Sequence, residues 1–189
     1  MKINKMDSDL QELKKNIEEY ASSINQEAWF YPEYNGVMGF SGTKDIILLG
    51  LNPSSGTFPS KKDKLLYGLL KEKGLEYIHI TDFIKIRAKN KHVSNLITNS
   101  DLMKKQSDFF SDELFIIKPK IIITIGGQCN NLLKQYFPKI DKCYKVFQIK
   151  HYSYRYQPEE SLFKEIYVQL DEIKKEYKSL SKRKDMGEE

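Results

Sequence analysis

The chain has 189 residues, of which 40% are hydrophobic and 30% charged, and its formal net charge is +5. This length and composition suit one globular domain with its own core. The sequence has no run of about 18 apolar residues that could span a bilayer. Its N-terminus has no apolar signal-peptide core, and its two cysteines are too few for a disulfide framework, so we expect a cytoplasmic protein without membrane contact.

The first element that the pattern predicts is a helix over residues 7–21, where apolar residues recur at helical spacing. Residues 22–44 are irregular and rich in aromatic side chains. We expect the aromatic segment around residues 29–34 to cover the sheet, and lining of the ligand pocket is the alternative. Strands and helices then alternate. They are a strand at 45–49, a helix at 62–73, a strand at 77–81, a helix carrying Met103, Phe110, Leu114 and Ile117, a strand at 121–125, a helix carrying Cys129, Leu132, Leu133, Tyr136 and Phe137, a strand at 146–149, and a helix at about 158–178 before a polar tail that we expect to fray.

Continuous apolar strands separated by helices, such as IIITI at 121–125, are typical of a parallel sheet covered on both faces. We therefore expect an α/β protein, with a single domain over 1–189, a core over about 45–156, and a three-layer α/β/α sandwich around a four-stranded parallel sheet. Right-handed crossovers place all strand carboxyl ends at one edge, where open α/β sheets bind ligands. Four loops should meet there, beginning at Gly50, Thr81, Gly126 and Lys150.

The first of these loops reads GLNPSSGTFP. It is not a phosphate-binding P-loop, because Gly50 and Gly56 are separated by five residues and no lysine precedes Thr57. Pro53 restricts Asn52 to an extended backbone, so the Asn52 amide could be held out to position a water molecule. An ordinary turn explains the same stretch, since Asn, Pro, Ser and Gly all favour turns.

The second and third loops carry charge and glycine. In ITDFIKIR, Asp82 follows the strand, and Lys85 and Arg87 alternate with isoleucines, which predicts two cations on one side of an extended segment. Such cations can hold phosphates, although a solvated basic turn has the same pattern. Gly126 and Gly127 precede a helix, where they permit either close approach of an anion or helix-on-strand packing.

The fourth loop mixes polar and aromatic side chains in the order Lys150, His151, Tyr152, Ser153, Tyr154, Arg155 and Tyr156. A histidine at a strand end can donate a hydrogen bond to a developing oxyanion, and cations and hydroxyls can bind phosphates. Aromatic packing beneath the last helix is the alternative interpretation. The mild positive charge is compatible with nucleic acid as partner, and equally with a solvated lysine-rich surface.

Taken together, GLNPSSG, ITDFIKIR, KPKIIITIGG and HYSYR resemble segments of the uracil-DNA glycosylase superfamily, in the same order and over about residues 45–156. The first motif is most similar to that of mismatch-specific uracil and thymine glycosylases. The resemblance implies a monomer that needs no cofactor or metal, binds DNA with one base flipped out, and hydrolyses the bond between a damaged or mismatched base and deoxyribose.

The resemblance also implies roles for individual residues. Asn52 would position the attacking water, and His151 would stabilise the negative charge gathering on the departing base. The flipped base would contact Gly50, Leu51, Phe58 and Asp82. Tyr154 or Arg155 would be the wedge that fills the space left by the flipped base. The residues that would contact the DNA are Ser54, Lys85, Arg87, Lys150, Ser153, Tyr154 and Arg155.

Three positions depart from the superfamily pattern. Tyr152 replaces the usual proline between His and Ser, so the wedge loop can differ in shape. Asp82 stands where some relatives carry a base-reading Asn; a carboxylate accepts hydrogen bonds but does not donate them, so we expect that uracil is not the preferred base. Two cysteines are too few for an iron–sulfur cluster. Two other functions remain open, namely a nucleic-acid or nucleobase-binding protein without activity, and an enzyme acting on a small nucleotide.

Overall fold

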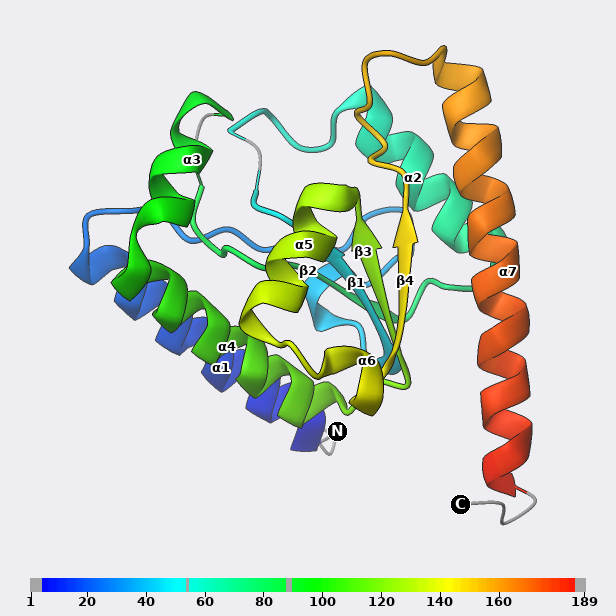
Figure 1. The fold of residues 1–189 in the computed structure, drawn as a ribbon, viewed down its shortest axis with the longest axis horizontal. Helices are drawn as coiled ribbons and strands as arrows, with labels where there is room; N and C mark the ends of the chain where they lie inside the picture. Colours follow the sequence, from blue (N-terminus) through cyan, green and yellow to red (C-terminus); the bar gives the residue numbers. More distant parts are fainter. Residues whose placement is uncertain (1–4, 54, 88–89, 186–189) are drawn as a thin grey trace.

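The computed structural model describes residues 5–53, 55–87 and 90–185, and it has the predicted three-layer α/β/α architecture (Figure 1). Four parallel strands form one sheet in the order β2-β1-β3-β4. In chain order the elements are α1 (Lys5–Ser23), η1 (Gly39–Ser41), β1 (Lys44–Gly50), α2 (Lys61–Glu72), β2 (Ile78–Asp82), α3 (Asn90–Thr98), α4 (Ser100–Ile117), β3 (Ile121–Ile125), α5 (Gly127–Tyr136), α6 (Ile140–Cys143), β4 (Lys145–Ile149) and α7 (Glu159–Asp185).

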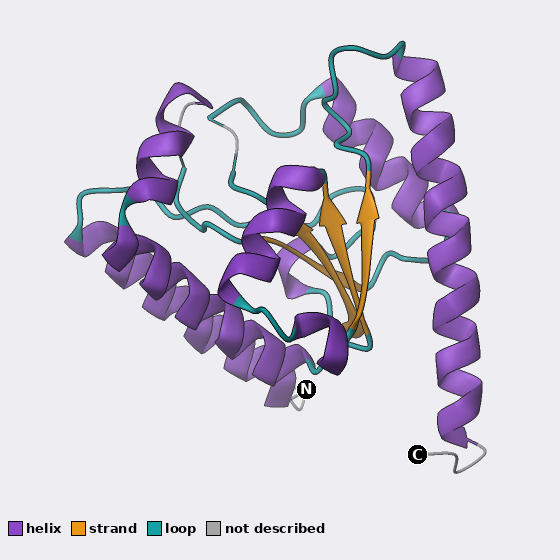
Figure 2. Cartoon of the chain, viewed as in Figure 1, coloured by secondary structure: helices purple, strands orange, loops and turns teal. Residues whose placement is uncertain are grey.

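The central strand β1 is apolar on both sides because both faces of the sheet are covered. Its side chains alternate, so that Ile46 and Leu48 belong to one apolar cluster while Ile47 and Leu49 belong to another. Helices α2 and α7 complete the first cluster, and α4 and α5 complete the second (Figure 2). Helix α1 packs on α4, burying Leu13, Ile17 and Phe109 between them. The predicted parallel sheet with helices on both faces is therefore confirmed.

The helices differ from the prediction mainly where they are short or terminal. The sequence pattern did not predict α3, α6 or η1, of which α6 has four residues and η1 three. Helix α7 continues to Asp185, beyond the predicted end at residue 178, because residues 179–185 contain neither proline nor glycine. None of the helices in the described ranges is long and apolar enough to cross a membrane.

The carboxyl ends of all four strands lie at one edge of the sheet, and β1 occupies the topological switch point. The chain leaves β1 for β2 on one side and returns to β3 on the other. Beyond the strands, the N–H groups of Phe83 and Ile84 donate to the carbonyls of Gly50 and Leu51 at 2.8 and 2.9 Å. These two bonds fix the segment that enters the Asn52 loop to the end of β2.

Candidate functional site

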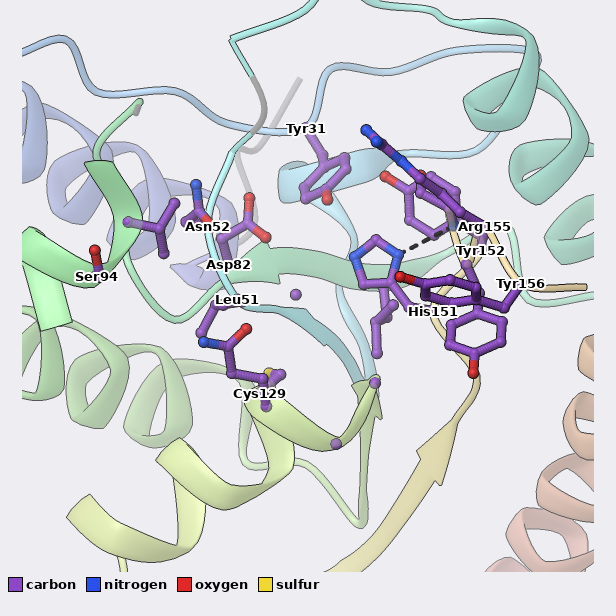
Figure 3. A pocket seen from close by; sticks show the side chains of 18 residues that line it. Tyr31, Leu51, Asn52, Asp82, Ser94, Cys129, His151, Tyr152, Arg155 and Tyr156 are labelled. Atoms are coloured by element: carbon purple, nitrogen blue, oxygen red, sulfur yellow. Dashed lines mark hydrogen bonds between the residues drawn. The ribbon is translucent and has the colours of Figure 1, made fainter. Parts of the chain in front are cut away.

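A cavity of about 750 Å³ opens at this edge of the sheet (Figure 3). Every loop expected to converge there contributes to its wall, and so do Tyr31 and α3. Asn52 and His151, which are far apart in the sequence, line this same cavity. The lining residues are Tyr31, Gly50, Leu51, Asn52, Asp82, Val93, Ser94, Ile125, Gly126, Gly127, Gln128, Cys129, His151, Tyr152, Ser153, Tyr154, Arg155 and Tyr156.

The Asn52 side chain is half-buried, and a local hydrogen bond sets its orientation. Its amide nitrogen donates to the carbonyl oxygen of Pro53 at 3.0 Å. No donor from the described residues occupies Oδ1, so this oxygen can accept a hydrogen bond from a water molecule or a ligand. This local hydrogen bond is typical of a turn, and it also fixes the amide so that Oδ1 could position a water molecule. Both interpretations of the loop are therefore compatible with it.

His151 is held as a neutral imidazole with a defined tautomer. Its Nδ1 accepts a hydrogen bond from the backbone N–H of Ser153 at 3.0 Å, which leaves the proton on Nε2. Partial burial, together with the nearby Lys62 ammonium, lowers the pKa of His151. The ring stacks on Tyr152 with centroids 5.2 Å apart. The remaining N–H can therefore donate to an acceptor in the cavity.

The amino end of α5 also faces the cavity, through Gly126, Gly127 and Gln128. Gly126 has φ of +81° and no side-chain cap, so the first N–H groups of the helix are left for other acceptors. A side chain at Gly126 would also come within 3.3 Å of the His151 Cβ. Gly126 is therefore compatible with both interpretations of the glycine pair. It packs closely on His151, and it also begins a helix whose first N–H groups can bind an anion.

Asp82, the last residue of β2, lines the cavity with its side chain almost entirely buried. The residue is 3% exposed, and neither carboxylate oxygen has a hydrogen-bond partner among the described residues. Burial raises the pKa of Asp82 to about 7; the Lys85 ammonium opposes this shift and the Glu113 carboxylate adds to it. The Tyr31 hydroxyl lies close to the carboxylate and lowers this pKa, although neither carboxylate oxygen has a partner at hydrogen-bonding geometry. Gly50 leaves room for the carboxylate, since a side chain there would overlap Asp82 Oδ1.

Lys85 was predicted to contact DNA, and the structure contradicts this. The side chain is fully buried. Its ammonium donates to Glu113 Oε2 at 2.9 Å and to Thr81 Oγ1 at 2.9 Å, and it also contacts the backbone carbonyl of Asp82. Ile84 is equally buried, so the segment does not separate a charged face from an apolar one. An ammonium enclosed in this way is not available to a phosphate.

Arg87 stabilises a neighbouring loop instead of pointing into the main cavity. Its guanidinium donates to the carbonyl of Gly56 at 3.0 Å, lies 3.5 Å from Glu27 Oε1 and sits over the Trp29 ring. It lines a second, smaller hollow of about 100 Å³ next to the main cavity. Phe58 also belongs to this hollow and packs against the Trp29 ring, with centroids 5.8 Å apart. The structure therefore does not place Phe58 where it would stack on a base in the main cavity.

Lys150 points away from the main cavity. Its ammonium contacts Glu165 Oε2 at 2.8 Å and Gln157 Oε1 at 2.9 Å, which ties the start of the loop to α7. The predicted phosphate contact is not supported at this position, because the cation already has a carboxylate partner. Ser54, another predicted DNA contact, lies outside the described residues.

The structure brings Gly50, Leu51, Ser153, Tyr154 and Arg155 to the cavity wall, as the predicted roles require. It also adds residues that the sequence interpretation missed, among them Tyr31, Tyr152, Gln128 and Cys129. Tyr31 was expected to be part of a covering segment. Its hydroxyl lies close to both Asp82 and Tyr152, and burial together with these neighbours raises its pKa. A tyrosine between Phe30 and Pro32, in the irregular segment that precedes the first strand, was the available signal.

Comparison of the chain with models of known protein families gives no match, and comparison with curated protein sequences gives none either. The functional interpretation therefore depends on the site itself. The described residues contain no group of three or more His, Cys, Asp and Glu side chains arranged to hold a metal ion.

Proposed function

We propose that this protein is a DNA glycosylase of the uracil-DNA glycosylase type, which hydrolyses the bond between a damaged or mismatched base and deoxyribose. The observation that carries the proposal is the shared cavity of Asn52 and His151 at the switch point of a parallel sheet. Asn52 presents an acceptor that no described residue occupies, and His151 presents a donor; both suit the cleavage of a glycosidic bond by water.

In the proposed reaction, the bond between C1′ and the base nitrogen breaks, and its electron pair stays with the base. The Asn52 Oδ1 accepts a hydrogen bond from the water whose oxygen bonds to C1′, and the proton that this water loses passes through solvent to the departing base. His151 Nε2–H donates to an acceptor on the departing base, where the amino end of α5 also favours negative charge. An amide is a weak general base, so positioning and charge stabilisation must lower most of the barrier, and we expect slow turnover.

The DNA backbone would meet the rim of the cavity. Ser153, Tyr154 and Arg155 line that rim, and Arg155 has no ion-pair partner within the described ranges. Lys62 lies close enough to His151 to lower its pKa, so it adds a second cation beside the site. Tyr154, which is 45% exposed, is suited to enter the space left by a flipped base. The DNA partner, the monomeric state and a cytoplasmic location are parts of this proposal.

The test is a panel of duplex and single-stranded oligonucleotides carrying uracil, a thymine mismatch, hypoxanthine or an alkylated base. The protein should leave abasic sites that are cleaved by alkali, without added metal, on at least one member. Asn52→Ala should lower the rate at least a hundredfold, on the order of one removed catalytic interaction. Asn16→Ala, at an exposed position of α1, is the matched control and should leave the rate unchanged.

Retention of DNA without scission across the whole panel would overturn the proposal and would instead assign a nucleic-acid-binding protein. Cleavage of mononucleotides with no action on oligonucleotides would assign an enzyme of small nucleotides. Equal scission by the wild type and Asn52→Ala would place the chemistry elsewhere.

A further inference from the structure

The proposed reaction gives no role to the Asp82 carboxylate in the cavity wall. Its two oxygens are buried without a hydrogen-bond partner in the described part of the chain. The neighbouring buried carboxylate, Glu113, is satisfied: Oε1 accepts from Thr81 at 3.0 Å and Oε2 from Lys85 at 2.9 Å. Lys85 contacts the backbone carbonyl of Asp82 and not its carboxylate. Because an unpaired buried acceptor costs free energy, this arrangement indicates a carboxylate kept for a ligand.

The groups that face Asp82 do not supply the missing donors. Lys85 and Glu113 lie behind it as a buried ion pair. On the cavity side are Cys129 and the Tyr31 hydroxyl, and burial keeps both protonated by raising the pKa of each. The carboxylate packs directly against Gly50, because a Cβ there would overlap Asp82 Oδ1. Asp82 lines the cavity, so a ligand there would meet acceptor oxygens once the groups that now cover them move aside.

We propose that Asp82 selects a base whose edge presents two adjacent N–H donors, the ring N–H and exocyclic amino group of a guanine-type base, and that it selects against uracil. A carboxylate accepts at both oxygens and matches two parallel donors, as it does with a guanidinium. Uracil offers one N–H between two carbonyls, and these carbonyls would oppose the carboxylate. Adenine and cytosine each present an amino group beside a ring acceptor, so guanine is the one common DNA base with two neighbouring donors.

This inference rests on the proposed function, and the chemistry of the site narrows it to guanine alkylated at N7. Alkylation puts a positive charge on the base and makes the ring N–H more acidic, so the two-donor edge is present while that N–H stays protonated. When the C1′–N9 bond breaks, the electron pair on N9 neutralises that charge, water oxygen bonds to C1′, and the proton lost by water passes to solvent. Because a neutral base leaves readily, the attacking water needs little activation by a general base, in agreement with an amide at position 52.

Two features of the cavity wall are compatible with a cationic purine, whereas the amino end of α5 and the Lys62 ammonium beside His151 favour negative charge. His151 is neutral, so it adds no repulsive charge. Tyr31 and Tyr152 bring aromatic rings to the cavity wall, where an aromatic face attracts a cation. Unmodified guanine has the same two-donor edge but no charge to release, so its glycosidic bond would stay intact.

Binding of free bases separates this inference from the proposed activity. Calorimetry at pH 8, where most of the Asp82 carboxylate is ionised, should show tighter binding of 7-methylguanine than of uracil or hypoxanthine. Asp82→Asn should bind 7-methylguanine about ten- to a hundredfold more weakly, which corresponds to the loss of one bidentate pair. The same variant should bind hypoxanthine more tightly than the wild type does, because an amide can meet one donor and one acceptor. Asp108→Asn, at an exposed position of α4, is the control and should bind like the wild type.

Equal affinity of the wild type and Asp82→Asn for 7-methylguanine would overturn the inference, as would no detectable binding or tighter binding of uracil by the wild type. Oligonucleotides carrying either 7-methylguanine or uracil provide the activity comparison. If the wild type cleaves at uracil and Asp82→Asn has the same base preference as the wild type, the proposed function is supported and the base selection is overturned. Selective binding of 7-methylguanine without scission of any oligonucleotide would support the base selection and overturn the glycosylase.

Discussion

Asp82 makes the stability of the protein depend on pH in a direction unusual for a carboxylate. Burial raises its pKa in the folded protein to about 7, whereas an aspartate in an unfolded chain titrates near about 3.9. Between these pH values the folded state binds more protons than the unfolded state. The contribution of Asp82 to stability is therefore full below pH 4 and falls as the pH rises to 7.

We predict that Asp82→Asn raises the free energy of unfolding at pH 8 by about 2–4 kcal/mol and changes it little at pH 4.5. At pH 8 the wild type must bury an ionised carboxylate, while the amide is neutral and has the same shape. Urea unfolding at the two pH values measures the difference. An effect of the same size at both pH values would show that titration of Asp82 is not its cause.

For individual residues, the sequence indicated which residue follows each strand but not which groups that residue contacts. Asn52, Asp82 and His151 were placed correctly at one edge because the order of elements determines that edge. The pairing of Lys85 was not predictable in the same way, because its partner Glu113 comes 28 residues later on α4. Lysine is seldom buried unless it is paired, so the pattern alone favoured exposure.

At the scale of elements, the Lys85–Glu113 pair joins the end of β2 to α4. Both side chains are buried, and the pair also has His79 Nε2 at 3.7 Å from Glu113 Oε1. Although burial alone would raise the pKa of Glu113, Lys85 and His79 hold it below its usual range. The contact between the end of β2 and α4, next to Asp82, is therefore a buried ion pair.

We predict that Glu113→Gln lowers the free energy of unfolding by about 3–5 kcal/mol, because it leaves a buried ammonium without a counter-charge. Glu176→Gln is the matched control. Glu176 pairs with Lys145 at 3.7 Å on the surface, so this change should amount to less than about 1 kcal/mol. Urea unfolding at pH 7 measures both variants, and losses of similar size would contradict a special role for the buried pair.

The longer elements were predictable because burial on both faces produces continuous apolar strands and periodic helices. IIITI at β3 is the clearest case, and its predicted bounds agree with the structure. The four-residue α6 has too few turns for a period to be visible. The position of Tyr31 in the cavity also lay beyond the sequence pattern, since an irregular segment has no period that orients its side chains.

At the scale of the whole molecule, the net charge of +5 matters through its distribution. Lys150 and Lys61 are paired with Glu165 and Glu159, so these cations contribute little net charge to the rim. Arg155 lies on the cavity wall without such a partner among the described residues. Binding of a polyanion at the rim should therefore depend more on Arg155 than on the lysines that already form ion pairs.

We predict that Arg155→Gln weakens binding of duplex DNA and lowers the slope of log affinity against log salt by about one. Lys145→Gln, at the opposite end of β4 from the cavity, is the control and should leave the slope unchanged. Fluorescence anisotropy over a series of salt concentrations measures both. Equal slopes for the wild type and Arg155→Gln would remove Arg155 from the DNA contact surface.

The two hydrogen bonds that continue the β1–β2 ladder past Gly50 and Leu51 have a consequence for how a ligand enters. They tie the side of the cavity with Asn52 and Asp82 to the sheet. The opposite side, with His151, is a loop held by its own turn and by the tie from Lys150 to α7. We therefore expect the cavity to widen for a bulky nucleotide more on the side of the His151 loop than on the Asn52 side, so that this loop adjusts the distance between the water and the leaving group.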